Sequence, residues 1–404
     1  MFRFIGREEE TMEPGAIRAA AERRRSETVE RVRQLVELES PTGDGDAVDA
    51  VVDVMAARLQ ALGAVIARTA TPGGSHLVAE LPGAGALASA PPALLLGHSD
   101  TVWPVGTLIG SPWSAERGVI RGPGSLDMKS GLAIIEAALA VTHELGGDRM
   151  PARVVVCCDE EIGSPSFDTV FRQALTGVSC VLGFEAPHPD GGVKVGRWGS
   201  TRLRLSVAGR AAHAALDPQN GVSAIDELVD QLLRVREIVA DEGGADGGTL
   251  LNTGAVSGGG RANVVPDGAE ALLGLRFAAP DVERRVLDRI LSLAPLRAGA
   301  VVEAEILSQR PAWEPGEASA GVVSALARIS AELGMPFRAA EARGAADTNL
   351  SGAMGVPTID GLGPIGGGAH ALSEHASIDA IVDRVALVAA FLTTAVMPAS
   401  PAEP

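Results

Sequence analysis

The chain has 404 residues, of which 46% are hydrophobic and 21% are charged. Its 34 Lys and Arg residues against 51 Asp and Glu residues give a net charge of −17 at pH 7. A chain of this length can form two or three domains and bury a large core without a disulfide or a structural metal. An acidic surface repels phosphate backbones and anionic lipids, and only 3% of the residues are aromatic, so neither nucleic acid nor a membrane is expected as a partner.

The cysteines and the N-terminal segment indicate a reducing compartment. Three cysteines, two of them adjacent at Cys157 and Cys158, are too few for a disulfide scaffold and predict buried, reduced thiols. The segment MFRFIGREEETMEPG contains no apolar stretch of signal-peptide length. No window approaches the roughly 20 apolar residues of a membrane span. We therefore expect a cytoplasmic protein.

The first part of the chain alternates between helical and strand patterns. Amphipathic helices are predicted over 16–39 and 47–62, where apolar residues recur at helical spacing. After them we expect strands over 64–69, 76–81, 93–97, 152–158 and 178–184, and helices over 128–145 and 167–175. This alternation predicts a layered α/β domain in which helices cover a sheet.

A different pattern begins near residue 196. Residues 200–208 alternate polar and apolar side chains, which is typical of a strand with one exposed face. A helix over 219–239, strands over 249–257 and 270–278, a helix over 281–293 and a strand over 300–307 then follow. This β-α-β-β-α-β order is that of the ferredoxin-like arrangement. We therefore expect a main domain made of residues 1–195 and 309–404, interrupted by an α+β insert over 196–308.

Imidazole and carboxylate side chains recur at the ends of predicted strands, the edge at which an α/β sheet binds its ligands. The strand over 93–97 leads into His98, and Asp100 follows two residues later, where an extended chain points both side chains to the same side. Asp100 can then accept the second ring N–H of His98, as a carboxylate does behind a metal-bound histidine. For this segment alone, a core histidine capped by a turn aspartate is the alternative.

Two acidic segments can likewise be explained either by a functional site or by an ordinary structural role. In GPGSLD, two glycines lead to Asp127 at the head of a helix, where an aspartate can simply be an N-cap. The strand over 152–158 ends in Asp159, Glu160 and Glu161. Three carboxylates at the mouth of a buried strand repel one another, which favours a bound cation over a solvated acidic turn.

The last two segments supply Glu185 and His370. VLGFEAP reads as a buried strand that ends in Glu185, and a glycine-rich loop leads to His370. The glycine-rich approach and the following Glu374 favour His370 over His375 as a ligand. Together, the five segments place two histidines and three acids at the ends of separate strands, a ligand set suited to Zn²⁺ or Mn²⁺.

In their order, and over nearly the whole chain, these segments resemble the motifs of a dinuclear zinc family. They read GHSDT, GPGSLDMKSG, DEEIGS, a Glu-ended strand and GGGAH. The family contains aminoacylases, dipeptidases, acetylornithine deacetylases, succinyl-diaminopimelate desuccinylases and glutamate carboxypeptidases, and GHSDTVWPVGTL is most similar to the last branch. The resemblance implies a zinc-exopeptidase-like mixed sheet flanked by helices. It also implies that the main domain is catalytic and that the insert is a ferredoxin-like lid and dimerisation domain.

The resemblance further implies a role for each matching residue. Five residues would bind two divalent metal ions: His98 and Glu185 one, Glu161 and His370 the other, and Asp127 both. Glu160 would be the general base for a hydroxide that bridges the metals, with Asp100 supporting the site, and the Asp127–Met128 peptide bond would be cis. Zinc is the expected metal, with cobalt and manganese as alternatives.

The insert carries further residues that match family positions. His213 in GRAAHAALDPQN would act in the active site of a partner protomer in a homodimer, although a lone loop histidine is more often a surface residue. Asn263 in RANVVPD and Arg276 in LGLRF match positions that hold the substrate carboxylate or the reacting carbonyl, and an arginine fork binds a carboxylate bidentately. Asp347 and Asn349 match a substrate-side loop.

These assignments imply a metal-dependent hydrolase that cleaves an amide bond next to a carboxylate. The expectation is a glutamate-carboxypeptidase-like exopeptidase, acting on a small-molecule substrate such as a peptide or an N-acyl amino acid. An N-acyl-amino-acid deacylase or an N-carbamoyl amidohydrolase would use the same metals with a different leaving group. A catalytically silent binding protein of the same fold would lack a ligand or the base, and none of the six positions is missing.

Overall fold

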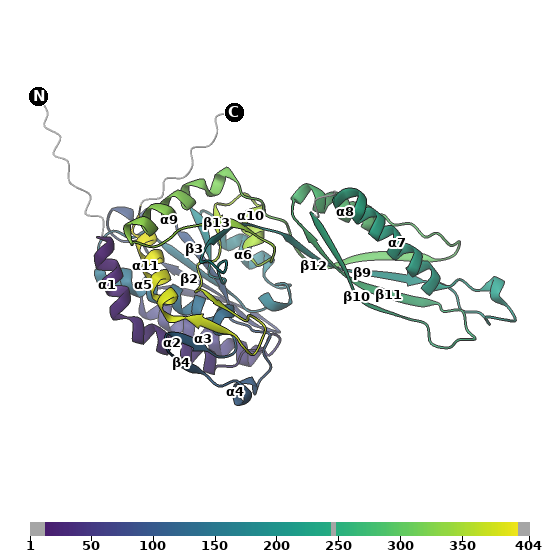
Figure 1. The fold of residues 1–404 in the computed structure, drawn as a ribbon, viewed down its shortest axis with the longest axis horizontal. Helices are drawn as coiled ribbons and strands as arrows, with labels where there is room; N and C mark the ends of the chain where they lie inside the picture. Colours follow the sequence, from purple (N-terminus) through teal and green to yellow (C-terminus); the bar gives the residue numbers. More distant parts are fainter. Residues whose placement is uncertain (1–12, 244–247, 395–404) are drawn as a thin grey trace, which may run out of the picture. The chain divides into compact units, whose positions relative to one another are not determined.

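The computed structural model of the protein describes residues 13–243 and 248–394. The first twelve residues, on which the signal-peptide expectation rests, lie outside these ranges. The chain forms two compact units (Figure 1): the first contains Met1–Val195, Pro315–Ala340 and Met354–Pro404, and the second contains Gly196–Glu314 and Glu341–Ala353. Each unit has its own cluster of buried apolar side chains.

The first unit is built on a mixed six-stranded sheet. Its strands lie in the order β1 (Val65–Thr71), β2 (Gly74–Leu81), β6 (Ala152–Cys157), β3 (Ala93–His98), β7 (Cys180–Gly183) and β14 (Thr358–Ile359). β2 is antiparallel to its neighbours β1 and β6, whereas β3 runs parallel to both β6 and β7. The carboxyl ends of β3, β6 and β7 therefore meet at one edge of the sheet, and the expected α/β class is confirmed.

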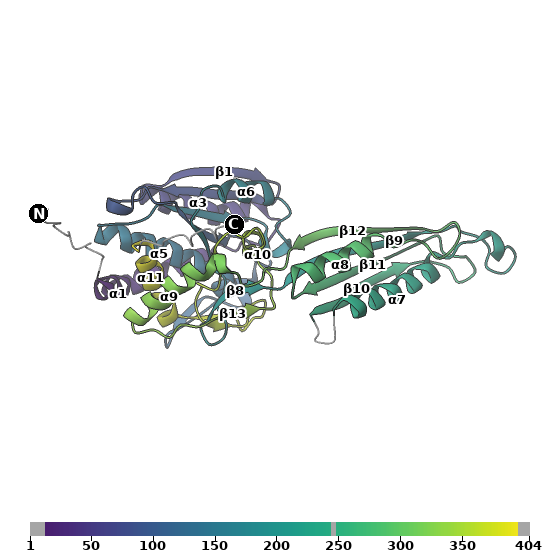
Figure 2. The ribbon, with the colours of Figure 1, turned by 90° about the horizontal axis from the view of Figure 1, so that it is seen from above.

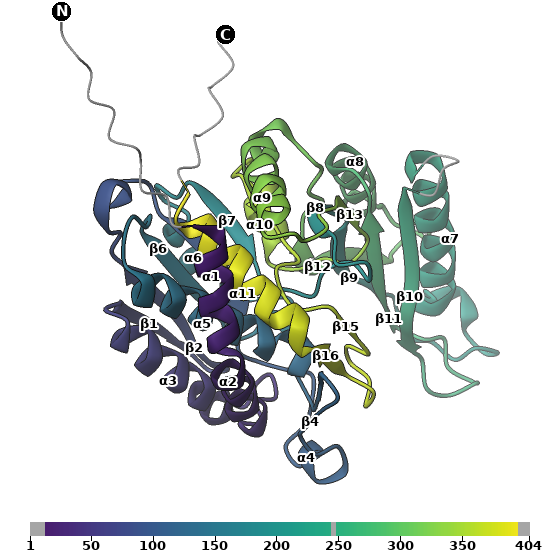
Figure 3. The ribbon, with the colours of Figure 1, turned by 60° about the vertical axis from the view of Figure 1, so that its left-hand side comes forward.

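Helices cover this sheet, and both its central strand β3 and its nearest helix are buried on all sides. Every residue of β3 is buried, as are all residues from Ser130 to Thr142 of α5 (Ser130–Leu145). α5 contacts β3 and packs beside α1 (Pro14–Arg23) and α11 (Ile378–Leu392) (Figure 3). The other elements of this unit are α2 (Arg25–Glu37), α3 (Gly45–Ala61), α4 (Thr107–Gly110), β4 (Ser114–Glu116), β5 (Val119–Arg121), α6 (Asp168–Ala174), α9 (Ala320–Glu332), β15 (Gly366–Gly367) and β16 (His375–Ser377). β8 (Val193–Arg197) and β13 (Ala339–Ala342) extend across the boundary between the units, and α10 (Thr348–Ala353) belongs to the second unit.

The second unit has the ferredoxin-like order that its sequence predicts. Its four strands, β9 (Gly199–Ala208), β10 (Thr249–Gly258), β11 (Gly268–Phe277) and β12 (Val301–Arg310), form an antiparallel sheet in the order β10-β11-β9-β12. α7 (Ala224–Gly243) and α8 (Pro280–Leu291) cover one face of this sheet (Figure 2). Alternate residues of β9, such as Leu203 and Leu205, are buried, so the opposite face is open.

Three predicted helices differ from the observed ones. The helix expected over 16–39 is divided at Arg24, whose ψ of −1° ends α1 and lets α2 leave in a new direction. The helix expected from 219 begins at Ala224, because Val222 is instead paired with Arg210 in a β-bridge. The helix expected from 128 begins at Ser130, after a turn in which Asp127 and Met128 have non-helical dihedral angles.

Two expectations from composition can be checked against the described residues. All three cysteines are buried and none forms a disulfide, as predicted. None of the helices within 13–243 and 248–394 combines the length and the apolar character that a membrane crossing requires.

Gly131 in the first turn of α5 offers a test of the packing behind the sheet edge. A Cβ atom there would lie 2.7 Å from Cε of Met128 and would also clash with the carbonyl oxygen of Phe184. We expect Gly131→Ala to lower the free energy of unfolding by about 1–3 kcal/mol in urea titration, because the backbone before Glu185 must shift. Gly15→Ala in α1, where a Cβ would meet nothing within 4 Å, is the control. Equal effects of the two substitutions would contradict the close approach.

Candidate metal centre

Parallel strands bring the candidate ligands together at the edge of the first unit's sheet. His98 is the last residue of β3, and Glu185 follows β7 by two residues. Glu161 lies in the turn Glu160–Ile162 that follows β6. Asp127 lies in the turn before α5, preceded by glycines, and His370 lies in the loop between β15 and β16 with a φ of 61°. The topology thus gathers side chains that are far apart in the sequence.

Asp127 lies between the two histidines. Its Oδ1 is 3.2 Å from Nε2 of His98, and its Oδ2 is 3.2 Å from Nε2 of His370. Oε1 of Glu185 is 3.4 Å from the same nitrogen of His98, and Oε2 of Glu161 is 3.3 Å from that of His370. The five residues therefore form two groups of three that share Asp127, and the ligand atoms within each group lie within 4.8 Å of one another. The Asp127–Met128 peptide bond is cis, as expected.

The residues present fit a pair of divalent cations. Imidazole nitrogens and carboxylate oxygens are the donors that zinc and similar ions take. Oε1 of Glu161 is buried without a hydrogen-bond partner, a position that a cation would satisfy. Burial, together with the charges of Asp127 and Asp100, raises the pKa of Glu161 to about 7, and a neighbouring cation would favour its ionised form.

The surrounding carboxylates favour the protonated form of both histidines. The hydrogen bond to Asp127, followed by the charge of Glu161, raises the pKa of His370 to about 9. Burial opposes the charge on His98, but Asp100, Asp127 and Glu185 together raise its pKa well above the usual range. Burial likewise opposes ionisation of Asp127, yet the two histidines keep its pKa below the usual range. Cations binding here must therefore displace protons.

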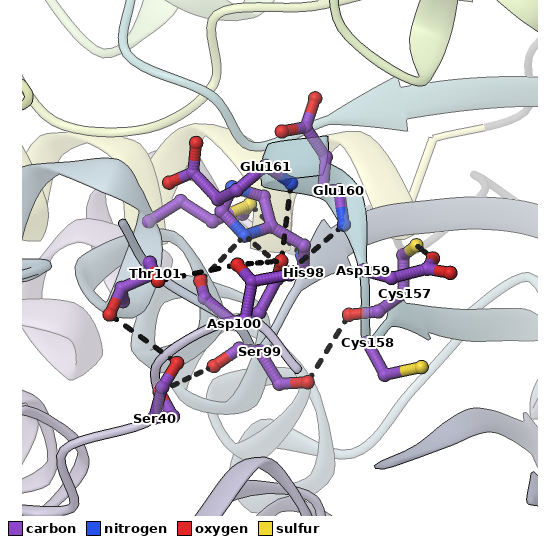
Figure 4. A network of polar contacts seen from close by, with 12 residues as sticks. Ser40, His98, Ser99, Asp100, Thr101, Cys157, Cys158, Asp159, Glu160 and Glu161 are labelled. Atoms are coloured by element: carbon purple, nitrogen blue, oxygen red, sulfur yellow. Dashed lines mark hydrogen bonds and ion pairs between the residues drawn. The ribbon is translucent and has the colours of Figure 1, made fainter. Parts of the chain in front are cut away.

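Asp100 connects His98 to the acidic turn after β6 (Figure 4). Its carboxylate accepts the backbone N–H groups of Glu160 and Glu161, both at 3.1 Å, and the hydroxyl of Thr42 at 2.8 Å. Nδ1 of His98 lies 3.0 Å from the carbonyl oxygen of Asp100 and 3.4 Å from its carboxylate. Asp100 therefore orients both a candidate ligand and the candidate base, and the contribution of Thr42 was not foreseen.

Glu160 is placed differently from its neighbour Glu161. It is buried and lies in the same turn, but it belongs to neither of the two three-residue groups. The carboxylates of both residues point away from Asp100 (Figure 4). Glu160 is therefore a sequence neighbour of a candidate ligand without being a member of either ligand group.

His375 and Trp103 lie near the centre without joining the ligand groups. Nδ1 of His375 is 2.9 Å from the carbonyl oxygen of Ser373, and His375 belongs to neither group. The indole N–H of Trp103 donates to Glu374, at 2.9 Å. Sequence reasoning gave Glu374 no role beyond supporting His370. The sequence feature that could have indicated a role for Glu374 is its position four residues after His370.

A third cluster of potential ligands, formed by His76, Cys157 and Asp159, is explained by hydrogen bonds. The thiol of Cys157 donates to Oδ1 of Asp159 at 3.2 Å, and the hydroxyl of Ser166 donates to Oδ2 at 2.6 Å. Nε2 of His76 lies 2.8 Å from the same hydroxyl. These contacts satisfy the cluster and hold the acidic turn in place.

The remaining predicted residues belong to the second unit. His213 is exposed, and its Nδ1 accepts the backbone N–H groups of Ala215 and Leu216, which leaves Nε2 to carry the proton. Asn263 is exposed on the adjacent loop, where its carbonyl oxygen accepts the N–H of Ala214. His213 and Asn263 therefore lie on neighbouring backbone segments.

Arg276 lies in a positive cluster on the open face of the second unit's sheet. Arg276 in β11 and Arg310 in β12 both pair with Ser200, which lies between them in β9. Arg202, two residues after Ser200, lies on the same face of the sheet. Burial and the charges of Arg202 and Arg310 hold the pKa of Arg276 below its usual range. Arg310 is paired with Asp347 at 3.1 Å, but no described acidic side chain pairs with Arg276 or Arg202. These two guanidinium groups can therefore bind an external anion.

Asn349, which the resemblance places in a substrate-side loop, is buried within the second unit. Its side chain is fully buried and donates to the carbonyl oxygens of Trp198 and Pro311, at 3.0 and 2.8 Å. Its amide oxygen accepts the N–H of Ala346. Asn349 thus holds segments of the second unit together.

The chain is similar in sequence to several known proteins. The model of the peptidase family M20/M25/M40 matches residues 94–394. Carboxypeptidase G2 from a Pseudomonas species is 28% identical over 374 residues, covering 89% of this chain and 87% of that protein. Succinyl-diaminopimelate desuccinylase from a Caulobacter species is 33% identical over 196 residues, covering 45% of this chain and 49% of that protein.

Solved structures share the fold. The aminopeptidase PepT from Bacillus cereus has a TM-score of 0.70 at 20% identity, covering 91% of this chain and 98% of its own. A dinuclear metal-binding peptidase from Bacillus subtilis has a TM-score of 0.65 at 16% identity, covering 92% and 98%. The chain therefore belongs to the peptidase family M20/M25/M40 and is a metal-dependent hydrolase.

Proposed function

We propose that this protein is a carboxypeptidase that removes a C-terminal, carboxylate-bearing amino acid, in the manner of a glutamate carboxypeptidase. The observation that carries the proposal is the position of Asp127, whose two oxygens each face a histidine and a second carboxylate. The similarity to carboxypeptidase G2 over 89% of the chain supports this branch of the family.

The ligand groups define which residues would hold the metals. His98 and Glu185 would hold one cation, Glu161 and His370 the other, and Asp127 both. When bound, such a pair polarises a carbonyl group and lowers the pKa of water to about 7. Zinc is the metal we propose, with cobalt and manganese as alternatives.

Glu160 would move the proton during hydrolysis. As general base it would accept a proton from the attacking water, and as general acid it would deliver that proton to the leaving amine. Asp100 would keep this side chain in place, because its carboxylate holds the backbone N–H of Glu160. Burial of Glu160 keeps bulk water from competing for the proton.

The second unit would supply substrate recognition as a lid and dimerisation domain. Arg276, supported by the charge of Arg202, would bind the carboxylate beside the scissile amide. Asn263 would hydrogen-bond the substrate. In a homodimer, His213 would donate its Nε2–H to the negative charge that develops on the carbonyl oxygen of the substrate bound by the other protomer. The free, buried cysteines support a cytoplasmic location.

An N-acyl-amino-acid deacylase is the second candidate, favoured by the similarity to a desuccinylase over 45% of the chain. The two functions differ in the acyl group that is cleaved from the carboxylate-bearing amino acid: a peptidyl or folyl-type group in one case, and a simple acyl group in the other. A panel of folyl-type glutamates, dipeptides, N-succinyl and N-acetyl amino acids, assayed with zinc, cobalt and manganese, separates them.

We expect the highest kcat/KM for amides with a C-terminal glutamate. Preference for N-succinyl substrates would favour the deacylase. If the metal-loaded protein hydrolysed no amide, we would conclude that it is a catalytically silent binding protein of the same fold.

A further inference from the structure

Glu374 lies buried beside the turn that carries Asp127, and all of its hydrogen-bonding capacity is directed at that region. Oε1 accepts the backbone N–H of Leu126 at 2.8 Å and that of Asp127 at 3.0 Å. Oε2 accepts the backbone N–H of Gly124 at 2.8 Å and the indole N–H of Trp103 at 2.9 Å. Only 2% of the surface of Glu374 is exposed, so water does not replace these N–H groups as hydrogen-bond donors to its carboxylate.

The N–H groups that bind Glu374 form a cradle, that is, a concave set of donors suited to an anion. Gly124 adopts a φ of 71°, in the left-handed region that favours glycine, and the N–H groups that follow it converge on one point. Successive N–H groups in such a turn create a concavity that binds anions. No arginine or lysine donates a hydrogen bond to Glu374 among the described residues: its hydrogen bonds come from backbone N–H groups and one indole, and burial raises the pKa of its carboxyl group while these hydrogen bonds lower it.

Glu374 also belongs to the segment that supplies His370. The N–H of Ala371 donates to Gly368, and the N–H of Glu374 donates to Ala371, both at 2.9 Å. These two turns hold His370 and Glu374 on one short, hydrogen-bonded segment. Because Glu374 also binds the backbone of Asp127, it connects two ligands of the same candidate metal group, Asp127 and His370, that are far apart in the sequence.

We propose that Glu374 is a positioning residue for the metal centre. By binding the N–H groups of the turn that ends at Asp127, it fixes the backbone from which the shared carboxylate faces both histidines, and it couples this backbone to the His370 loop. The inference rests on the proposed metal centre. It assigns Glu374 no contact with substrate and no proton transfer.

Metal titration of the metal-free protein tests the proposal independently of activity. Glu374→Gln preserves size but turns an NH₂ group toward N–H donors, so part of the cradle is lost. We expect zinc and cobalt affinity to fall by about 10–100-fold, as for other residues that orient metal ligands. We also expect kcat to fall at saturating substrate in limiting metal, with KM changing little.

Glu136→Gln is the matched control. Glu136 is a buried glutamate of α5 that pairs with Arg58 at 2.9 Å and lies in neither ligand group. Its loss should reduce thermal stability without changing metal affinity. Glu374→Asp, which keeps the charge but draws the oxygens back, supplies a second variant should Glu374→Gln fail to fold, and we expect it to bind metal more weakly than the wild type.

The outcomes separate this inference from the proposed function. A wild-type protein that binds no metal would remove the proposed function itself. A wild type that binds two ions, with a folded Glu374→Gln or Glu374→Asp variant of equal affinity, would overturn only the role of Glu374. An equal loss of affinity in Glu136→Gln would do the same, because it would show a general effect of lost stability.

Discussion

Replacing Glu160 by glutamine is expected to lower kcat by a factor of about 10²–10⁴ while the protein retains both metal ions. An amide has nearly the shape of the carboxylate but cannot accept the proton of the attacking water. Glu160 lies outside both ligand groups, and its backbone N–H remains bound to Asp100 in the variant. The measurements are kcat and KM on the best substrate of the panel and metal content by elemental analysis.

Glu161→Gln, one residue further along the same turn, is the control for this prediction. Glu161 belongs to the group with Asp127 and His370, so its substitution should weaken metal binding as well as turnover. The two neighbouring substitutions thus separate proton transfer from metal retention. Near-normal turnover in Glu160→Gln, or loss of metal from it, would contradict the role of general base.

The sequence predicts the strand-end residues of the site because their geometry is local. His98, Glu161 and Glu185 each follow an apolar run long enough to be a buried strand, and parallel strands end at a common edge. The pairing order itself is not local: β6 lies between β2 and β3 although it follows both in the chain. Motif resemblance, rather than periodicity, supplied the assignment of each ligand to one of two metals.

What the sequence did not predict are contacts between distant segments. The hydroxyl of Thr42 donates a hydrogen bond to Asp100, 58 positions away, and the carboxylate of Glu374 accepts one from the backbone N–H of Asp127, 247 positions away. Neither contact leaves a periodic pattern, because each joins individual polar groups in loops or turns. Arg202 likewise reads as one polar residue of an alternating strand, and only the strand register brings it to the face of Arg276. Residues 341–353 belong to the second unit for the same reason, through contacts such as those of Asn349.

Removal of the metals is expected to abolish hydrolysis, and Asp127→Ala is expected to do so by weakening both sites at once. Asp127 offers one oxygen to each group, whereas Glu185 belongs to one group alone. In titrations of metal-free protein with cobalt or zinc, Asp127→Ala should therefore lose tight binding of both ions. Glu185→Ala, the control, should lose one and keep the other. Loss of a single ion in Asp127→Ala would contradict the shared carboxylate.

The pH dependence of these titrations has a definite sign. Metal binding requires the neutral imidazole of His370, whose pKa is raised to about 9, and the ionised carboxylate of Glu161, whose pKa is raised to about 7. Protons therefore compete with the metal below these values, and affinity should increase as the pH rises from about 6 to 9, with proton release visible in calorimetry as a dependence on buffer ionisation enthalpy. The His370→Ala variant should show a weaker increase, because one of the two competing groups is gone. An affinity that stays constant over this range would mean that the carboxylates around Asp127 do not hold the histidine in its charged form.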